Sequence, residues 1–212
     1  MNTDKYFETR FVEDKSRTKV WKAINEYLQK YIAEDSCVLD LGCGYGDFIK
    51  GIKANSKFAI DLNQNLFSNF SDSNVKFTAQ SILEQFPYSE HTVDVVFASN
   101  LFEHFNDEEL EVILSNIKRV LKPKGKLILL QPNIFYAYKE YWDDYTHKKA
   151  FSHVSLSDFL SSQDFNILDI FKKFIPFSLK SRLPKSYILT KLYLNSPFKP
   201  FAKQMLVVAE KK

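Results

Sequence analysis

The sequence predicts an α/β fold in which helices cover both faces of a mostly parallel sheet. Short apolar runs alternate along the chain with amphipathic segments of helical spacing, the pattern of strands joined by crossover helices. Three of the five glycines, Gly42, Gly44 and Gly46, stand at alternate positions after the first apolar run. With 212 residues, 45% of them hydrophobic, the chain is long enough for one well-buried core, so we expect a single domain over residues 1–212.

The helices are predicted from apolar residues that recur at helical spacing. An apolar stripe runs along residues 18–32, so we expect residues 1–34 to form an N-terminal helical section. Residues 107–125 begin with acidic side chains and end with basic ones, an order that the helix dipole favours. Further helices are expected at residues 47–54, 63–70 and 155–165.

Seven strands are predicted from short apolar runs bounded by turn residues. In a parallel sheet, ligands bind beyond the carboxyl ends of the strands, and the glycine turn falls at that edge. The expected strands are residues 37–42, 57–63, 74–81, 92–102, 125–133, 166–177 and 203–211.

The charge is distributed unevenly along the chain. The net charge is +3, but Ile170–Ala209 carries eight basic residues and no acidic one, which leaves −5 for the rest. Such a segment forms a solvated face, receives an anionic substrate or lies against an anionic membrane surface. Nucleic acid is not expected as a partner, because the sequence contains no recognised nucleic-acid-binding module.

The sequence also predicts where in the cell the protein is located. It has no apolar run of about 18 residues and no basic-then-apolar leader, so we expect neither a membrane span nor a signal peptide. Cys37 and Cys43 have no CxxC partner, so we expect reduced thiols rather than a disulfide or a zinc site. A cytoplasmic location follows as the expectation, with peripheral contact at the inner face of the membrane left open.

The glycine turn suits two classes of ligand. A dinucleotide site has G-x-G-x-x-G, with an acidic residue about 20 positions further on for the ribose. Here the spacing is G-x-G-x-G, and Asp47 stands where the last glycine of that fingerprint would be. Asp61, at the end of the second expected strand, suits a ribose in either class, so this acidic residue does not discriminate between them.

Four ordered motifs between residues 36 and 133 decide between these classes: "VLDLGCGYGDF", "AIDLN", "TVDVVFASNLFEHF" and "RVLKPKGKLILLQPN". Together they resemble the class I S-adenosylmethionine-dependent methyltransferases, and more closely the small-molecule branch with many sugar and quinone methyltransferases. The C-terminal half resembles methyltransferases found with bacterial cell-surface polysaccharide enzymes. The resemblance implies a seven-stranded Rossmann-like sheet with an antiparallel last strand, S-adenosyl-L-methionine as cofactor, and O-methylation of a sugar or sugar-linked intermediate. N-methylation of a small amine and a non-catalytic cofactor-binding protein stay open.

The resemblance also implies the cofactor contacts. Asp61 would accept hydrogen bonds from both ribose hydroxyls, for which a carboxylate has the right two-oxygen geometry. Leu62 would lie against the adenine. Ser81 stands where the family often has an Asp for the adenine amino group, a departure that weakens this contact. The other implied residues are Asp40, Gly42, Gly44 and Gly46 around the methionine moiety, Ile82 beside Ser81, and the main chain of Ser99 and Asn100 facing the sulfonium.

Candidates for a catalytic base follow the fourth and fifth expected strands. A hydroxyl acceptor needs a base, whereas an amine acceptor needs only to be neutral. His147 is the first candidate, because a histidine with a carboxylate neighbour, here Asp144, is suited to take a hydroxyl proton near neutral pH. The alternative is that His147 orders a loop. Glu103 and His104 form an "EH" pair that recurs in related methyltransferases, and they are the next candidates.

Residues 134–160 are expected to form a lid at the acceptor site. They are rich in tyrosine, whose rings suit stacking on a sugar face or covering the cofactor. Asp143, Asp144, His147 and His153 are metal-ligand types, but their spacing matches no standard site, so no metal is expected.

Residues 176–202 are expected to form an insertion between the last two strands. Its apolar and basic residues suit peripheral membrane contact. The expected partner is a small-molecule acceptor, anionic or linked to a nucleotide or a lipid. The sequence does not define the oligomeric state.

Overall fold

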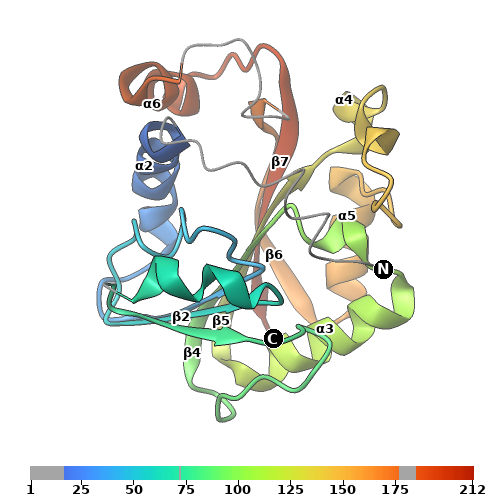
Figure 1. Ribbon diagram of the computed structural model, residues 1–212. Helices are drawn as coiled ribbons and strands as arrows, with labels where there is room; N and C mark the ends of the chain where they lie inside the picture. The colour runs from blue at the N-terminus through green and yellow to red at the C-terminus, as the bar shows by residue number, and fades with distance from the viewer. Residues whose placement is uncertain (1–16, 72, 177–184) are drawn as a thin grey trace.

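The computed structural model describes residues 17–71, 73–176 and 185–212. Seven strands form one sheet in the order β3-β2-β1-β4-β5-β7-β6 (Figure 1). β7 runs antiparallel to both of its neighbours, and the other pairs are parallel. This confirms the predicted α/β, Rossmann-like sheet and its antiparallel last strand. The strands are β1 (Cys37–Leu41), β2 (Ser56–Asp61), β3 (Val75–Ala79), β4 (Val93–Ser99), β5 (Leu121–Pro132), β6 (Phe165–Pro176) and β7 (Ala202–Lys211).

Helices on the two faces of the sheet bury two separate cores. α2 (Arg17–Leu28) and α6 (Tyr187–Asn195) lie side by side over one face, and α3 (Asp107–Val120) and α5 (His153–Ser162) cover the other (Figure 1). Successive side chains of a strand point to opposite faces, so the apolar runs of the sequence supply both cores. The short helices are η1 (Gln29–Tyr31), η2 (Gln64–Phe70), η3 (Phe102–His104), α4 (Ile134–Ala137) and η4 (Tyr141–Asp143).

α3 is shorter than predicted because the next strand begins directly at its end. Asn106 and Glu109 form a capping box at its start, in which each side chain accepts a hydrogen bond from the other residue's main-chain N–H. Leu121 is already extended, and Pro123 disfavours helical geometry at the residue before it. β5 therefore starts at Leu121 instead of residue 125.

The helix predicted over residues 47–54 is wrong. This segment forms hydrogen-bonded turns, in which Lys50 N donates to Gly46 O at 3.0 Å and Ile52 N to Phe48 O at 3.2 Å. Gly51 interrupts the segment, and a glycine costs a helix about 1 kcal/mol relative to alanine. The segment therefore keeps only about one turn of helical hydrogen bonds.

The predicted insertion contributes α6, which is fastened to α2 by a polar contact. Tyr187 Oη donates to Glu26 Oε2 at 2.7 Å, and Lys191 Nζ lies 2.9 Å from the same oxygen. Residues 1–16 of the expected helical section and 177–184 of the insertion lie outside the described residues. Within the described ranges, no helix has the length and apolar character needed to cross a membrane.

We predict that Phe97→Ala lowers the free energy of unfolding by about 3 to 5 kcal/mol, the usual cost of truncating a buried Phe. Phe97 is 1% exposed and stacks on Phe48 with ring centroids 3.8 Å apart. Chemical denaturation measures the change, with Val112→Ala as control, because Val112 is 45% exposed on α3. Equal losses in the two variants would contradict this account of the core.

Candidate active site

The glycine turn after β1 needs its glycines for conformation and for space. Gly42, Gly44 and Gly46 have φ angles of 62°, 52° and 77°, the left-handed region that glycine adopts most easily. A Cβ atom on Gly42 would lie 2.8 Å from Leu101 Cδ1, so the turn closes against the segment that follows β4. The main-chain N–H of Gly42 donates to Ile60 O at 2.8 Å, which ties the turn to the end of β2.

Asp61 is locked into place at the end of β2. Its Oδ2 accepts from Gly44 N and its Oδ1 from Asn63 N, each at 2.9 Å. The side chain is buried, and burial raises its pKa above the ordinary aspartate value despite these main-chain donors. The carboxylate is therefore fixed in orientation at the point where β1 and β2 both end.

Asp40, one of the predicted methionine contacts, lies in β1. It is fully buried, and its pKa is raised well above the ordinary aspartate range, first by burial and then by the charge of Asp61. The negative charge of Asp61 thus adds to burial in disfavouring the ionised form of Asp40.

Of the three predicted adenine contacts, one side chain is exposed and the other two are engaged elsewhere in the fold. Leu62 is 55% exposed, which leaves its side chain accessible to a flat ring. Ser81 Oγ accepts from Leu83 N at 3.2 Å, so this hydroxyl shapes the local turn. The side chain of Ile82 is buried in the core, so only its main chain is available to a ligand.

Ser99 and Asn100 stand where the chain leaves β4. Asn100 has a left-handed φ of 49°, and its N–H donates to Leu130 O at 2.8 Å. Its Oδ1 accepts from Gln204 Nε2 at 2.7 Å, so the antiparallel strand β7 supports this corner. Sequence reasoning missed Gln204 and also Gln131, a buried residue of β5 whose Nε2 has no hydrogen-bond partner among the described residues. A glutamine inside the apolar run "LILLQP" was the available signal.

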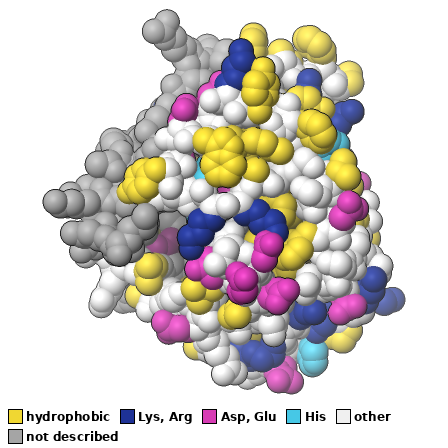
Figure 2. All heavy atoms as spheres, turned by 90° about the vertical axis from the view of Figure 1, so that its right-hand side faces the viewer, with side chains coloured by type: hydrophobic (Ala, Val, Ile, Leu, Met, Phe, Trp, Pro, Cys, Tyr) yellow, Lys and Arg dark blue, Asp and Glu magenta, His cyan; other side chains and the backbone are white. Residues whose placement is uncertain are grey.

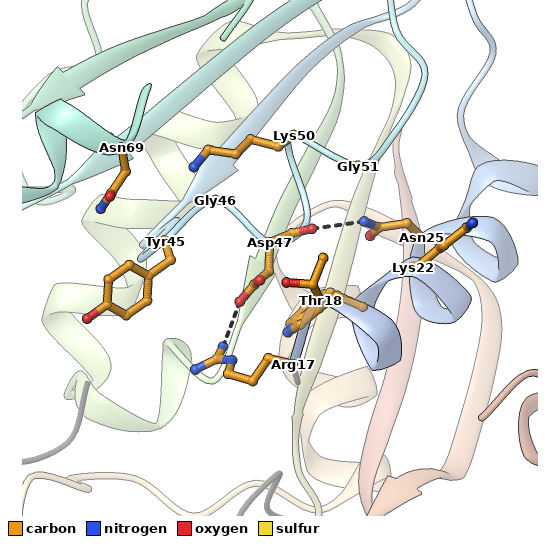
Figure 3. A pocket seen from close by; sticks show the side chains of 11 residues that line it. Arg17, Thr18, Lys22, Asn25, Tyr45, Gly46, Asp47, Lys50, Gly51 and Asn69 are labelled. Atoms are coloured by element: carbon orange, nitrogen blue, oxygen red, sulfur yellow. Dashed lines mark hydrogen bonds and ion pairs between the residues drawn. The ribbon is translucent and has the colours of Figure 1, made fainter. Parts of the chain in front are cut away.

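A cavity of about 500 Å³ borders the glycine turn on the side of α2 (Figure 3). Arg17 pairs with Asp47 at 3.0 Å, and Asn25 Nδ2 donates to Asp47 O at 2.9 Å. Gly46 lines this cavity, but Asp61 and Asn100 do not. This pocket could not be predicted from local patterns, because it joins α2 to a turn about 30 residues further along the chain.

Three candidate catalytic side chains meet beyond β4. One ligand-capable atom from each of Glu103, His104 and His147 lies within 4.8 Å of the other two. The main chain holds them together, because Glu103 O accepts from Lys148 N at 2.8 Å and from Lys149 N at 3.1 Å. The segment after η4 is thereby clamped onto η3, and residues more than 40 positions apart form one cluster.

Glu103 is the unusual member of this cluster. It is 1% exposed, and neither carboxylate oxygen has a hydrogen-bond partner within the described part of the chain. Burial, and to a smaller extent the charge of Asp144, raises its pKa to about 8. Burial also lowers the pKa of His104, and the neighbouring His147 lowers it further.

Hydrogen bonds to the two histidines orient their rings. His147 Nδ1 lies 2.6 Å from Tyr141 O, a carbonyl that can only accept, so Nδ1 carries the proton. Thr146 Oγ1 donates to Asp144 Oδ1 at 2.6 Å and therefore accepts from His104 Nδ1 at 2.9 Å. In the neutral form each ring then has its acceptor lone pair on Nε2.

A hydroxyl links Asp144 to the cluster. Asp144, expected to act beside His147, accepts a hydrogen bond from Thr146 Oγ1, which in turn accepts from His104 Nδ1. Sequence reasoning missed both Thr146 and Tyr141 as orienting residues. Their roles depend on the clamp between η3 and the later loop, which no local pattern encodes.

The expected lid, residues 134–160, presents aromatic side chains to solvent. Tyr138, Trp142 and Tyr145 are 57 to 69% exposed, whereas Tyr141 is buried and donates to Lys149 O at 2.7 Å. Figure 2 shows this side of the molecule, where hydrophobic side chains are spread over the upper half among basic and acidic ones. Tyr141 is therefore a structural residue and not part of an acceptor surface.

The metal-ligand set considered from the sequence does not form. Among the described residues, the grouped metal-ligand types are Glu103, His104 and His147, and His153 is not one of them. His153 Nδ1 lies 3.2 Å from Asn133 Nδ2 instead.

Comparisons with known proteins concern the domain and the fold. Residues 39–129 match the family model described as a methyltransferase domain. A crystal structure of an S-adenosylmethionine-dependent methyltransferase from Archaeoglobus fulgidus superposes with a TM-score of 0.69 at 19% identity, covering 100% of both chains. That likeness shows the fold.

Two curated relatives match part of the chain. An uncharacterised protein of Methanocaldococcus jannaschii is 33% identical over 115 residues, 54% of this chain and 49% of the relative. The ubiquinone/menaquinone biosynthesis C-methyltransferase UbiE of Wigglesworthia glossinidia brevipalpis is 29% identical over 142 residues, 60% of this chain and 56% of the relative. The chain thus spans about half the length of these relatives. Residues 39–129 match the methyltransferase-domain model, and the chain as a whole has the fold of a structure described as an S-adenosylmethionine-dependent methyltransferase.

Proposed function

We propose that this protein transfers the methyl group of S-adenosylmethionine to a hydroxyl of a small-molecule acceptor, a sugar or sugar-linked intermediate of cell-surface glycan biosynthesis. The observation that carries the proposal is the Glu103, His104 and His147 cluster directly beyond β4. The resemblance to methyltransferases implies that the sulfonium lies at the end of β4, which supports a proton-handling role for this cluster beside the methyl group.

The chemistry explains why such a cluster is needed. The cofactor already carries an activated methyl group, so the protein supplies orientation and, for a hydroxyl, removal of the proton. An amine acceptor would need only to be neutral. A buried carboxyl with two oriented imidazoles is more than an amine requires, which favours the hydroxyl over the alternative of N-methylation.

The cofactor is proposed to lie along the edge formed by the ends of β1, β2 and β4. Asp61 would accept from the ribose hydroxyls, Leu62 would contact the adenine, and the turn at Gly42, Gly44 and Gly46 would surround the methionine moiety. The fixed orientation of the Asp61 carboxylate supports this placement, because a preset acceptor loses less entropy on binding.

The acceptor is proposed to bind under the lid of residues 134–160. The exposed rings of Tyr138, Trp142 and Tyr145 support a partner with a stackable face, such as a sugar. A second candidate is methylation of a carbon atom, which the name of the UbiE relative, a C-methyltransferase, favours. Sugar and quinone acceptors both present a flat face, so the acceptor panel decides between them.

The C-terminal part is proposed to meet an anionic partner, the phosphate of a nucleotide- or lipid-linked sugar or the inner face of a membrane. α6 exposes Ile188, Leu189 and Leu192 by 51 to 65%, an apolar face that suits an interface. Lys191 is paired with Glu26, so its charge is partly neutralised. Lys180 and Arg182, two basic residues of this segment, lie outside the described residues.

We predict that Asp61→Asn weakens binding of S-adenosylhomocysteine by about 10- to 100-fold, because hydrogen bonds to a charged group contribute about 1.5 to 3 kcal/mol. Calorimetry measures the affinity, and Asp35→Asn, a change at an exposed acidic residue, is the control. Because burial raises the pKa of Asp61, wild-type affinity should fall as the pH is lowered toward that pKa. Unchanged affinity in Asp61→Asn would refute the ribose contact.

We predict that His147→Ala lowers the rate of methyl transfer by about 10² to 10⁴, the usual contribution of proton transfer, and leaves the affinity for S-adenosylhomocysteine unchanged. The assay follows labelled methyl groups onto a panel of nucleotide-linked sugars, quinones and amines. His91→Asn, at the other end of β4, is the matched control. Near-full turnover of His147→Ala would contradict its role as the base and would leave His104 as the next candidate or an amine as the acceptor.

We predict that Ile188→Ser with Leu192→Ser reduces co-sedimentation with vesicles that contain anionic lipid. Attraction of about 1 kcal/mol per basic residue is salt-sensitive, so high salt should weaken the wild-type binding further. Val112→Ser changes an exposed apolar residue of α3 and is the control. Equal sedimentation of all three proteins would exclude α6 as a membrane contact.

A further inference from the structure

The side-chain oxygens of Glu103 lack hydrogen-bond partners among the described residues, and the proposed methyl transfer does not explain why. A buried polar group almost always has a hydrogen-bond partner, and an unmet one costs about 1 to 3 kcal/mol. Protonation does not remove this cost, because a neutral carboxyl still has a hydroxyl to donate and an oxygen that accepts. Both oxygens of Glu103 are without a partner among the described residues.

The surroundings of Glu103 are those of a metal ligand. His104 and His147 are the residues that could bind the same ion as Glu103. One ligand-capable atom of each of the three residues lies within 4.8 Å of the other two. The ring centroids of the two histidines are 4.9 Å apart, with the planes at 68°. Because both Nδ1 atoms are committed to oxygen partners, Nε2 is the atom that each neutral ring offers to an ion.

The groups behind the histidines complete this arrangement. Metal-bound histidines usually give their other N–H to a carbonyl or, directly or through a further group, to a carboxylate, which fixes the ring. His147 has the carbonyl of Tyr141, and His104 has Thr146, whose hydroxyl is held in turn by Asp144. These hydrogen bonds orient the rings in the absence of any ion.

We propose that Glu103, His104 and His147 bind one divalent cation of the borderline class, such as Zn²⁺, through one carboxylate oxygen and two imidazole nitrogens. Two imidazoles and one carboxylate suit Zn²⁺ or Fe²⁺ better than Mg²⁺ or Ca²⁺, which prefer oxygen ligands throughout. Ligands about 2.1 Å from a tetrahedral ion lie about 3.4 Å apart, so the three side chains close in on binding. Three protein ligands would leave one position of a tetrahedral ion open to another ligand.

This proposed site replaces the expectation that the protein binds no metal. Its catalytic role rests on the proposed function, but the binding of the ion does not. An oxygen bound at the open position becomes more acidic, which is a way for the cluster to ionise an acceptor hydroxyl. In the metal-bound protein His147 is a ligand and not a free base. The binding of the ion itself requires no assumption about the acceptor.

The test is metal binding by the full chain, without any methyl acceptor. The protein is dialysed against a chelator and then titrated with Zn²⁺ and, separately, with Mg²⁺, and the bound metal is counted by mass spectrometry. We expect one Zn²⁺ per chain, with Mg²⁺ bound at least 100-fold more weakly, on the order of the preference for nitrogen ligands. Glu103→Gln and His147→Gln should each weaken Zn²⁺ binding by at least about 100-fold, more than the loss of an outer hydrogen bond.

Two further variants make the result specific. Thr146→Val keeps the shape of the side chain but removes the hydroxyl behind His104, and it should weaken Zn²⁺ binding by about 10- to 100-fold. His91→Asn removes a histidine far from the cluster and should bind Zn²⁺ like the wild type. If Glu103→Gln does not fold, His147→Gln, a change at a half-buried loop position, takes its place, with S-adenosylhomocysteine binding as the check of folding.

The proposal is overturned if the wild type binds no stoichiometric Zn²⁺, since a buried water is then the partner of Glu103. It is equally overturned if Glu103→Gln and His147→Gln retain wild-type Zn²⁺ affinity, or if His91→Asn loses it. Because the titration contains no acceptor, a wrong assignment of the methyl acceptor leaves this result unaffected. Failure of the metal site in turn leaves the transfer assay of the wild type unchanged.

Discussion

The parallel register around β1 is the constraint on which the site depends. Leu41 stands opposite Ile60 of β2 and Ala98 of β4, so all three strands end at the same edge of the sheet. A shift of one residue would exchange the side chains that face the two cores. Both faces are buried under helices, so the register is strongly specified, and with it the meeting of the glycine turn, Asp61 and Asn100.

The same edge collects buried groups that cost stability. Asp40, Asp61 and Glu103 are all nearly inaccessible to water, and burial raises the pKa of each. Main-chain donors offset this cost at Asp61, whereas at Glu103 its own main-chain N–H offsets only part of it and neither oxygen has a well-formed hydrogen bond within the described residues. A ligand can supply the hydrogen bonds or the positive charge that such buried carboxyls lack. Carboxyls with perturbed pKa values therefore gather at functional sites.

Elements with a strong periodic pattern can be predicted from the sequence here, and contacts across the fold cannot. The apolar runs predict every strand, and the acidic start of α3 predicts its first turn. The segment at residues 47–54 has helical spacing but packs as turns around Gly51. Thr146 and Tyr141 acquire their roles only when residues 148 and 149 pair with the main chain of Glu103, a contact that no local pattern encodes.

The central claim is that the ends of β1, β2 and β4 form one cofactor site. Amide NMR spectra recorded during a titration with S-adenosylhomocysteine test it most directly. The account predicts that the largest shifts fall on the N–H groups of Gly42, Gly44, Leu62 and Asn100, with little change at His91 on the opposite edge. Shifts confined to other parts of the sheet, or no shifts at saturating ligand, would contradict it.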